Sequence, residues 1–320
     1  MKISIPKEWL LERVHLEEGL EIGAGGPLEH QTPMLSIEWD RFPIKEMYKR
    51  NWFEGFTGSV SAAVTEAQTL VGGFMERAIR RPLVALQRQR VRTGSEADPY
   101  ALLAWQCRVL LLAKSAPAPK EFRIGTIDDA WMKTLVQLSR FEDGPIRARK
   151  QLGEAGIVLI VEPHLSSTHL DGAALLGDNG PVIGLTLRQD RLDNFWFVLL
   201  HELAHIKKHL KKGSVEDIFD EASSATEGLI DGSGAAPDEL EREADQLAGE
   251  ALISTDAWNT ALARFIQTED SVKSFAAQMR ISPAIVAGRI RREANNWTIL
   301  GNLVGQGEIR RLFPDVRFGW

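Results

Sequence analysis

The sequence predicts an α+β fold in which a helical N-terminal region precedes a domain with a small antiparallel sheet. Helical periodicity dominates the first 155 residues, short aliphatic runs with turn signals follow between residues 157 and 187, and a helix with two histidines comes next. Elements that are segregated along the chain in this way are typical of α+β domains. We therefore divide the 320 residues into a helical region, 1–143, and an α+β domain, 144–320.

The first 155 residues contain several stretches with helical spacing. An amphipathic stretch at 9–16 is followed by a glycine-rich break at 23–27, and Pro117 and Pro119 mark a hinge. Residues 100–113 are apolar on several faces, which is typical of a buried helix. The complete set of helices expected here is 59–79, 100–113, 127–140 and 145–155.

Three short strands are predicted next, at 157–161, 172–176 and 182–187. The sequence GDNG at 177–180 is a strong turn signal, so we expect the last two strands to form a hairpin. The strand at 182–187 is also a candidate for holding an extended peptide by backbone pairing.

A longer helix is expected to begin with Asp193 as its N-cap and to end near Leu210. An acidic loop rich in serine and glycine follows at 213–237, and then a helix at 238–252. The C-terminal part has the pattern of two or three helices, two of them around a turn at Ser282 and Pro283.

Composition excludes several classes of protein. The single cysteine, Cys107, rules out an internal disulfide framework and multi-cysteine metal sites. The longest apolar runs are too short to span a bilayer, and the N-terminus lacks the apolar core of a signal peptide. A net charge of −6 with 26% charged residues is ordinary for a globular protein. We expect a soluble, cytoplasmic protein.

The clearest chemical pattern is H-E-x-x-H at 201–205, on the predicted long helix. His201 and His205 are four positions apart, so both imidazoles lie on one helical face and can bind one metal ion. Glu202 lies beside the first histidine, where it can take a proton from water at the ion. The preceding apolar run, FWFVLL, argues against the alternative of a solvated histidine-rich surface.

A catalytic zinc site needs a third protein ligand and an open position. Glu239, Glu241 and Glu243 on the next helix all qualify by chemistry. Glu241 is favoured over Glu243 because Glu241 and Asp245 share a face, so that one can bind metal while the other supports a histidine. A merely solvated acidic helix is the alternative interpretation.

Other candidates are weaker. His209 extends the histidine face but lies among lysines, and His164, His169 and Arg188 flank the strands, where each is a low-ranking candidate for an oxyanion donor. Cys107 is expected to be inert core. Arginines cluster between residues 77 and 92, including Arg88 and Arg90, and the helices around Ser282 resemble a helix-turn-helix, although a packed helical hairpin is favoured.

The phrases DGAALL, VIGLTLRQDRLDNFWFVLLHELAH, E-x-x-A-D and ISPAIVAGRIR together resemble the ImmA/IrrE family of zinc metallopeptidases. The resemblance is closest to the C-terminal part of HigA-type helix-turn-helix regulators and covers about residue 145 to the end. It implies a gluzincin-like domain with one zinc ion. The family's ligand glutamate lies in E-x-x-A-[ND], which carries over onto Glu241, with Asp245 in the supporting position.

The resemblance also implies a substrate, since family members cleave a helix-turn-helix repressor or antitoxin in repressor and toxin–antitoxin systems. Residues 1–45 contain no helix-turn-helix pattern, which argues against direct DNA binding by this chain. The alternative function is a non-proteolytic regulatory or antitoxin subunit that acts by protein or DNA binding. Its test is that changes at Arg88 or Arg90, and not at Glu202, alter the phenotype.

Overall fold

The computed structural model describes residues 37–78, 98–116, 120–166, 168–209 and 237–319. The chain forms two compact units, residues 1–85 and 86–320, which are described separately below. The predicted boundary between residues 143 and 144 falls inside the second unit and stays a prediction. The predicted features at 9–16, 23–27, 117–119 and 213–236, and the arginines from Arg80 to Arg92, lie outside the described residues.

The first unit consists of short helices around an aromatic core. A 3-10 turn (Trp39–Arg41) precedes α1 (Ile44–Lys49), α2 (Val60–Thr65) and α3 (Ala67–Ala78). The helix predicted at 59–79 is therefore interrupted at Glu66, where α2 ends. Trp52 and Phe74 stack with their ring planes 5° apart, and both side chains are buried.

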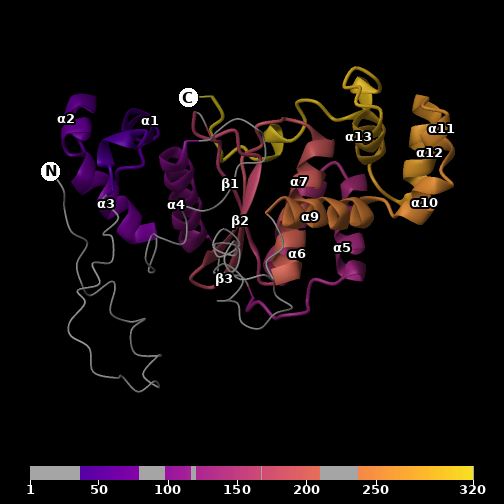
Figure 1. Cartoon of the computed structure of the whole chain (residues 1–320), viewed down its shortest axis with the longest axis horizontal. Coiled ribbons are helices and arrows are strands. Elements are labelled where there is room, and N and C mark those ends of the chain that lie inside the picture. Colours follow the sequence, from indigo (N-terminus) through magenta and orange to yellow (C-terminus); the bar gives the residue numbers. More distant parts are fainter. Residues whose placement is uncertain (1–36, 79–97, 117–119, 167, 210–236, 320) are drawn as a thin grey trace, which may run out of the picture. The chain divides into compact units, whose positions relative to one another are not determined.

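The second unit has a three-stranded sheet between helical layers (Figure 1). Its strands are β1 (Val158–Val161), β2 (Gly172–Gly177) and β3 (Gly180–Leu185), with β3 in the centre. The α+β class is confirmed. The helices are α4 (Pro99–Ser115), α5 (Asp129–Val136), α6 (Gly144–Glu154), α7 (Leu192–His209), α9 (Pro237–Leu252), α10 (Thr255–Asn259), α11 (Leu262–Phe265), α12 (Glu269–Met279) and α13 (Pro283–Glu293), with 3-10 turns at Gln137–Arg140, Gly301–Leu303 and Arg310–Leu312.

The sheet is mixed, whereas the sequence predicted an antiparallel one. β2 and β3 form the expected antiparallel hairpin, but β1 pairs with β3 in parallel. The turn at Asp178 and Asn179 fixes the hairpin locally, while the pairing of β1 depends on tertiary packing. A continuous aliphatic run such as that of β1 is typical of a parallel strand that is covered on both faces.

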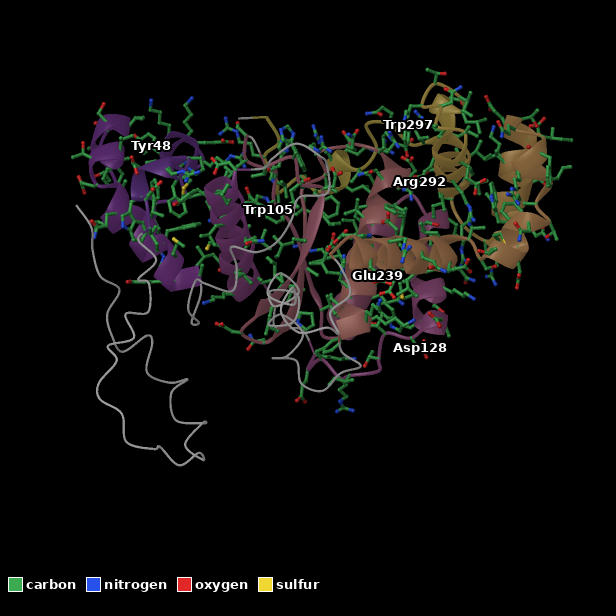
Figure 2. All side chains as sticks on the ribbon, viewed as in Figure 1. Tyr48, Trp105, Asp128, Glu239, Arg292 and Trp297 are labelled. Atoms are coloured by element: carbon green, nitrogen blue, oxygen red, sulfur yellow. The ribbon has the colours of Figure 1, made fainter. Side chains whose placement is uncertain are left out.

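Helix α4 covers one face of the sheet. A side chain at Gly184 of β3 would collide with Trp105 and Val109, so this glycine lets α4 lie directly on the strand. Trp105 lies on α4 (Figure 2), and its indole donates a hydrogen bond of 2.9 Å to the carbonyl of Glu162 after β1. Cys107 of the same helix is fully buried and burial raises the pKa of its thiol, which agrees with a role in the core.

Successive side chains of a strand point to opposite faces, so the sheet has a second face to cover. This face, opposite α4, packs on α7 and α6. Ile183 and Leu185 of β3 join the same buried cluster as Phe195 and Leu199 of α7. The hairpin of α12 and α13, with Ser282 as the N-cap of α13, packs on α7 as the favoured interpretation expected. Within the described residues, no helix combines the length and apolar character needed to cross a membrane.

Candidate metal centre

Helix α7 aligns the two predicted histidines. Its first half is buried through Phe195, Trp196 and Leu199, which fixes the rotation of the helix against the sheet. With 3.6 residues per turn, His201 and His205 then lie one turn apart on the side that meets α9. His201 is almost completely buried and His205 is partly exposed.

Helix α9 packs closely on this side of α7. Ala244 and Ala248 are both buried, and their small side chains let the two helix backbones approach each other. Glu241 and Asp245, which are one turn apart on α9, are thereby brought beside the histidines. Their spacing of four residues favours these two carboxylates in the sequence as well, because residues one turn apart share a helical face.

Three electron-pair donors converge between the helices. His201 Nε2 lies 3.2 Å from Glu241 Oε2, His205 Nε2 lies 3.4 Å from Glu241 Oε1, and the two Nε2 atoms are 2.9 Å apart. A tetrahedral zinc ion about 2.0–2.1 Å from each ligand requires donors about 3.3 Å apart. The donor set and its spacing therefore fit one zinc ion, and the three residues form the candidate metal cluster of the described chain.

Asp245 orients His201. Its Oδ1 atom lies 2.9 Å from His201 Nδ1. An ionised carboxylate only accepts hydrogen bonds, so with Asp245 ionised the Nδ1–H group of His201 is the hydrogen-bond donor. The other nitrogen, Nε2, then presents its lone pair toward Glu241 and His205, which is the tautomer that a metal ligand needs.

The environment of Glu241 favours its ionised form. Burial raises the pKa of this carboxyl group, but the His201 and His205 imidazoles, when they are protonated and hold no metal, outweigh burial through hydrogen bonds and charge and hold the pKa well below its usual range. An anionic carboxylate is the form that binds a metal ion.

The other acidic candidates on α9 point elsewhere. Glu243 forms an ion pair with Lys208, and Glu239 lies 3.5 Å from Arg242 on the exposed side of the helix. Of the three glutamates proposed from sequence, the structure brings Glu241 to the histidines.

The Glu202 side chain extends from α7 toward the start of β2. The residue is 7% exposed and therefore buried. A Cβ atom at Gly172 would lie 3.2 Å from Glu202 Oε1 and 2.7 Å from Val198 Cγ1, so the absence of a side chain at this glycine leaves room for the carboxylate. Sequence reasoning missed Gly172, although a glycine inside a strand pattern is a known signal of close approach.

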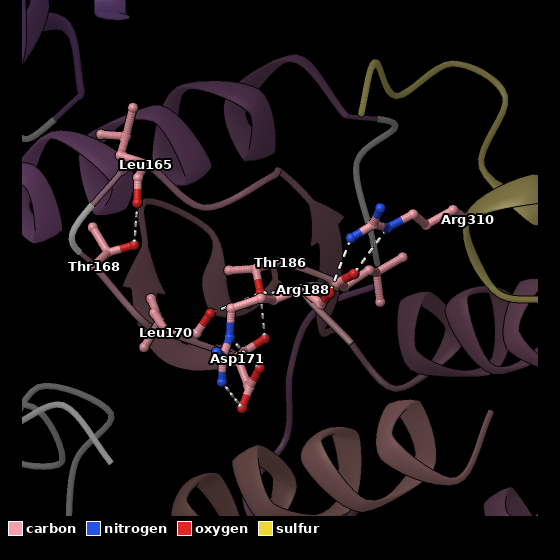
Figure 3. A network of polar contacts seen from close by, with 8 residues as sticks. Leu165, Thr168, Leu170, Asp171, Thr186, Arg188 and Arg310 are labelled. Carbon is pink, nitrogen blue, oxygen red and sulfur yellow. Dashed lines mark hydrogen bonds and ion pairs between the residues drawn. The ribbon is translucent and has the colours of Figure 1, made fainter. Parts of the chain in front are cut away.

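Arg188 takes part in a network of polar contacts at the ends of β2 and β3 (Figure 3), and its candidacy as an oxyanion donor stays a prediction. It binds Asp171 through two hydrogen bonds of 3.1 and 3.3 Å, and Thr186 donates to the Leu170 carbonyl. Arg310 adds bonds to the carbonyls of Leu187 and Arg188. These contacts, which we call the Arg188 network, tie the ends of β2 and β3 to the C-terminal segment.

The remaining histidines are not part of the candidate cluster among the described residues. His169 is exposed and has a positive φ of 47°, and His164 is partly buried. The side chain of His209 lies outside the described part of the chain.

The strand at 182–187 was predicted as a peptide-binding strand, and this prediction is wrong. β3 is central, and β1 and β2 occupy its two edges. β2 is the edge strand that contacts α7.

Comparison with known proteins gives a family match within the second unit. Residues 153–291 match the family model described as the IrrE N-terminal-like domain, Peptidase_M78. Comparisons with curated proteins and with solved structures give no match. The matched segment contains the candidate metal cluster, Glu202 and Asp245, and it supports a function of the metallopeptidase type. The match over residues 153–291 supports the ImmA/IrrE family that the sequence predicted.

Proposed function

We propose that this chain is a zinc-dependent endopeptidase of the H-E-x-x-H type. His201, His205 and Glu241 would hold the ion, and Asp245 would orient His201. The convergence of three electron-pair donors at zinc spacing carries the proposal. Two imidazoles and one carboxylate leave a fourth position for water or substrate, which distinguishes a catalytic from a structural zinc site.

When bound, zinc would supply Lewis acidity, which makes water a better nucleophile and polarises a carbonyl group. Glu202 would act as the general base that takes the proton from the attacking water, and it would return a proton to the departing amine. Its restricted space beside Gly172 supports this role, because a base is effective only when its carboxylate is held in place.

The substrate segment would approach from the side of β2. This edge strand contacts α7, and its first residue, Gly172, lies next to Glu202. An extended peptide along this end of β2 would bring a scissile bond to the base and the metal cluster. This arrangement replaces the pairing with residues 182–187 that the sequence suggested.

The proposed substrate is a helix-turn-helix repressor or antitoxin. This part of the proposal rests on the resemblance to HigA-type regulators and on the family match over residues 153–291.

The decisive experiment compares the proteomes of native cells with and without this protein and sequences all new N-termini. A Glu202→Gln variant is the matched control, because it keeps the three metal ligands and removes the base. We expect new termini that disappear in the control, with cleavage reduced by about 10²- to 10⁴-fold. Zinc content, measured on the purified proteins, should be equal in the two forms.

Full cleavage by the zinc-loaded Glu202→Gln variant would overturn the mechanism. If no termini change while zinc still binds, the alternative function as a non-proteolytic regulatory subunit gains support. That alternative predicts an unchanged phenotype in Glu202→Gln and an altered one in variants of Arg88 or Arg90.

A further inference from the structure

Arg292 lies close to the candidate metal centre, one residue beyond the family match. It is an exposed residue in the last turn of α13, where this helix packs on α7 (Figure 2). Its Cζ atom is 3.5 Å from the centroid of the Phe197 ring, and that ring is 6.2 Å from the ring of His201. The guanidinium group is therefore within about 10 Å of the His201 imidazole.

Phe197 places Arg292 on one flank of the histidine row. With 3.6 residues per turn, Phe197 and Val198 are rotated by about 100° around α7, and His201 and His205 point between these two directions. The start of β2 lies on the Val198 side, next to Glu202. Arg292 and β2 thus flank the metal cluster from opposite sides.

The charged groups around the cluster differ between its centre and the two ends of the histidine row. Glu241 and Asp245 contribute carboxylates at the centre itself. The cations at the C-terminal end of α7 face other groups, since Lys207 is paired with Asp129 and Lys208 with Glu243. At the other end of the histidine row, Arg292 adds a positive charge over the Phe197 ring.

A guanidinium group stacked on an aromatic ring is well suited to bind carboxylates. Stacking holds the plane of the group, and its N–H donors point outward along the edges, where a carboxylate can accept two of them. Phe197 is 8% exposed as a residue and is fixed by its place in α7, so its ring provides a rigid support.

We propose that Arg292 forms a subsite that recognises a carboxylate of the substrate about two or three residues from the scissile bond. An extended chain advances about 3.3 Å per residue, so this number of residues covers the distance from the cluster to Arg292. The carboxylate is an acidic side chain or the C-terminal group of the substrate. The inference rests on the proposed peptidase function and adds its substrate preference.

The test uses the full-length, zinc-loaded protein and two pools of synthetic peptides in which Asp or Glu is placed at each position in turn. One pool has amidated C-termini and the other has free C-termini. Cleavage sites and rates are read by mass spectrometry for the unaltered protein and for Arg292→Ala, Arg292→Lys and Arg292→Glu. Arg264→Ala is the matched control, because Arg264 also lies over a phenylalanine, Phe265, on α11.

We expect the unaltered protein to prefer a carboxylate at one fixed position by about tenfold or more, which is the usual effect of a charge-assisted hydrogen bond. Arg292→Ala should lose this preference while cleaving neutral peptides at an unchanged rate, and Arg292→Glu should prefer a basic residue there. Arg292→Lys should keep part of the preference, and Arg264→Ala all of it. A preference in both pools indicates an acidic side chain, and one confined to free C-termini indicates the terminal carboxylate.

A binding measurement separates recognition from chemistry. In the Glu202→Gln background, Arg292→Glu should weaken binding of the preferred acidic peptide by a similar factor, as measured by fluorescence anisotropy, and leave a neutral peptide unaffected. Cleavage that depends on Glu202 but shows the same preference with and without Arg292 overturns the inference and leaves the proposed function standing. The absence of any Glu202-dependent cleavage overturns the proposed function, and the inference with it.

Discussion

The metal cluster and the Arg188 network are both polar assemblies that join distant segments, but they differ in how donors and acceptors are matched. In the Arg188 network the N–H groups of Arg188 and Arg310 point at carboxylate or carbonyl oxygens. In the metal cluster, two imidazole nitrogens and a carboxylate all offer electron pairs to the same point. The first pattern matches hydrogen-bond donors with acceptors and needs no ligand. The second brings electron-pair donors together and is suited to bind a cation.

The largest expected effect separates the two glutamates of α9. Glu241→Ala removes one of the three proposed ligands and should lower zinc affinity by more than about 100-fold, exceeding the usual loss from a supporting residue. Glu243→Ala should leave zinc affinity unchanged, because Glu243 faces Lys208. Competition with a chromogenic chelator measures both. Equal losses in the two variants would contradict the assignment of Glu241.

The next effect concerns the support of His201. Asp245→Asn removes the anionic acceptor of the Nδ1–H hydrogen bond while keeping nearly the same shape. We expect zinc affinity to fall by about 10- to 100-fold, with the helices intact. The same chelator assay, together with circular dichroism, checks this. An unchanged affinity would mean that His201 is oriented by packing alone.

A smaller effect is expected where β2 meets Glu202. Gly172→Ala introduces a methyl group against Val198 and Glu202, and we expect cleavage to fall by about tenfold or more while zinc still binds. Gly249→Ala on α9 is the control, since its added methyl group meets no atom within 4 Å. Activity and zinc content are compared for both variants. Unaltered cleavage by Gly172→Ala would show that the position of Glu202 does not depend on this glycine.

The smallest effect tests the Arg188 network as structure. Arg188→Met should lower the free energy of unfolding by about 1–2 kcal/mol, because it leaves a partly buried Asp171 without its ion pair. Zinc affinity should stay the same. Arg147→Met, which removes an exposed ion pair with Asp143, should cause no measurable change. Urea unfolding of all three proteins measures the difference, and loss of zinc by Arg188→Met would link the network to the site.

Local sequence signals accounted for much of the domain. Turn residues at 177–180 fixed the hairpin of β2 and β3, and the apolar run before His201 predicted a helix with a buried first half. The helix at 59–79 was predicted as continuous, because periodicity across Glu66 does not reveal that α2 ends there. The parallel pairing of β1 was missed because it joins segments without a shared turn.

The sequence by itself determined that His201, Glu202 and His205 lie one turn apart or less on one helix, because helical geometry follows from local spacing. It also placed Glu241 and Asp245 on a common face of α9. Only the tertiary structure decided that this face, and not that of Glu243, meets the histidines, and that Gly172 and Arg292 lie beside them. These contacts join residues that are distant in sequence, and their geometry depends on how α7, α9, α13 and β2 pack around buried side chains.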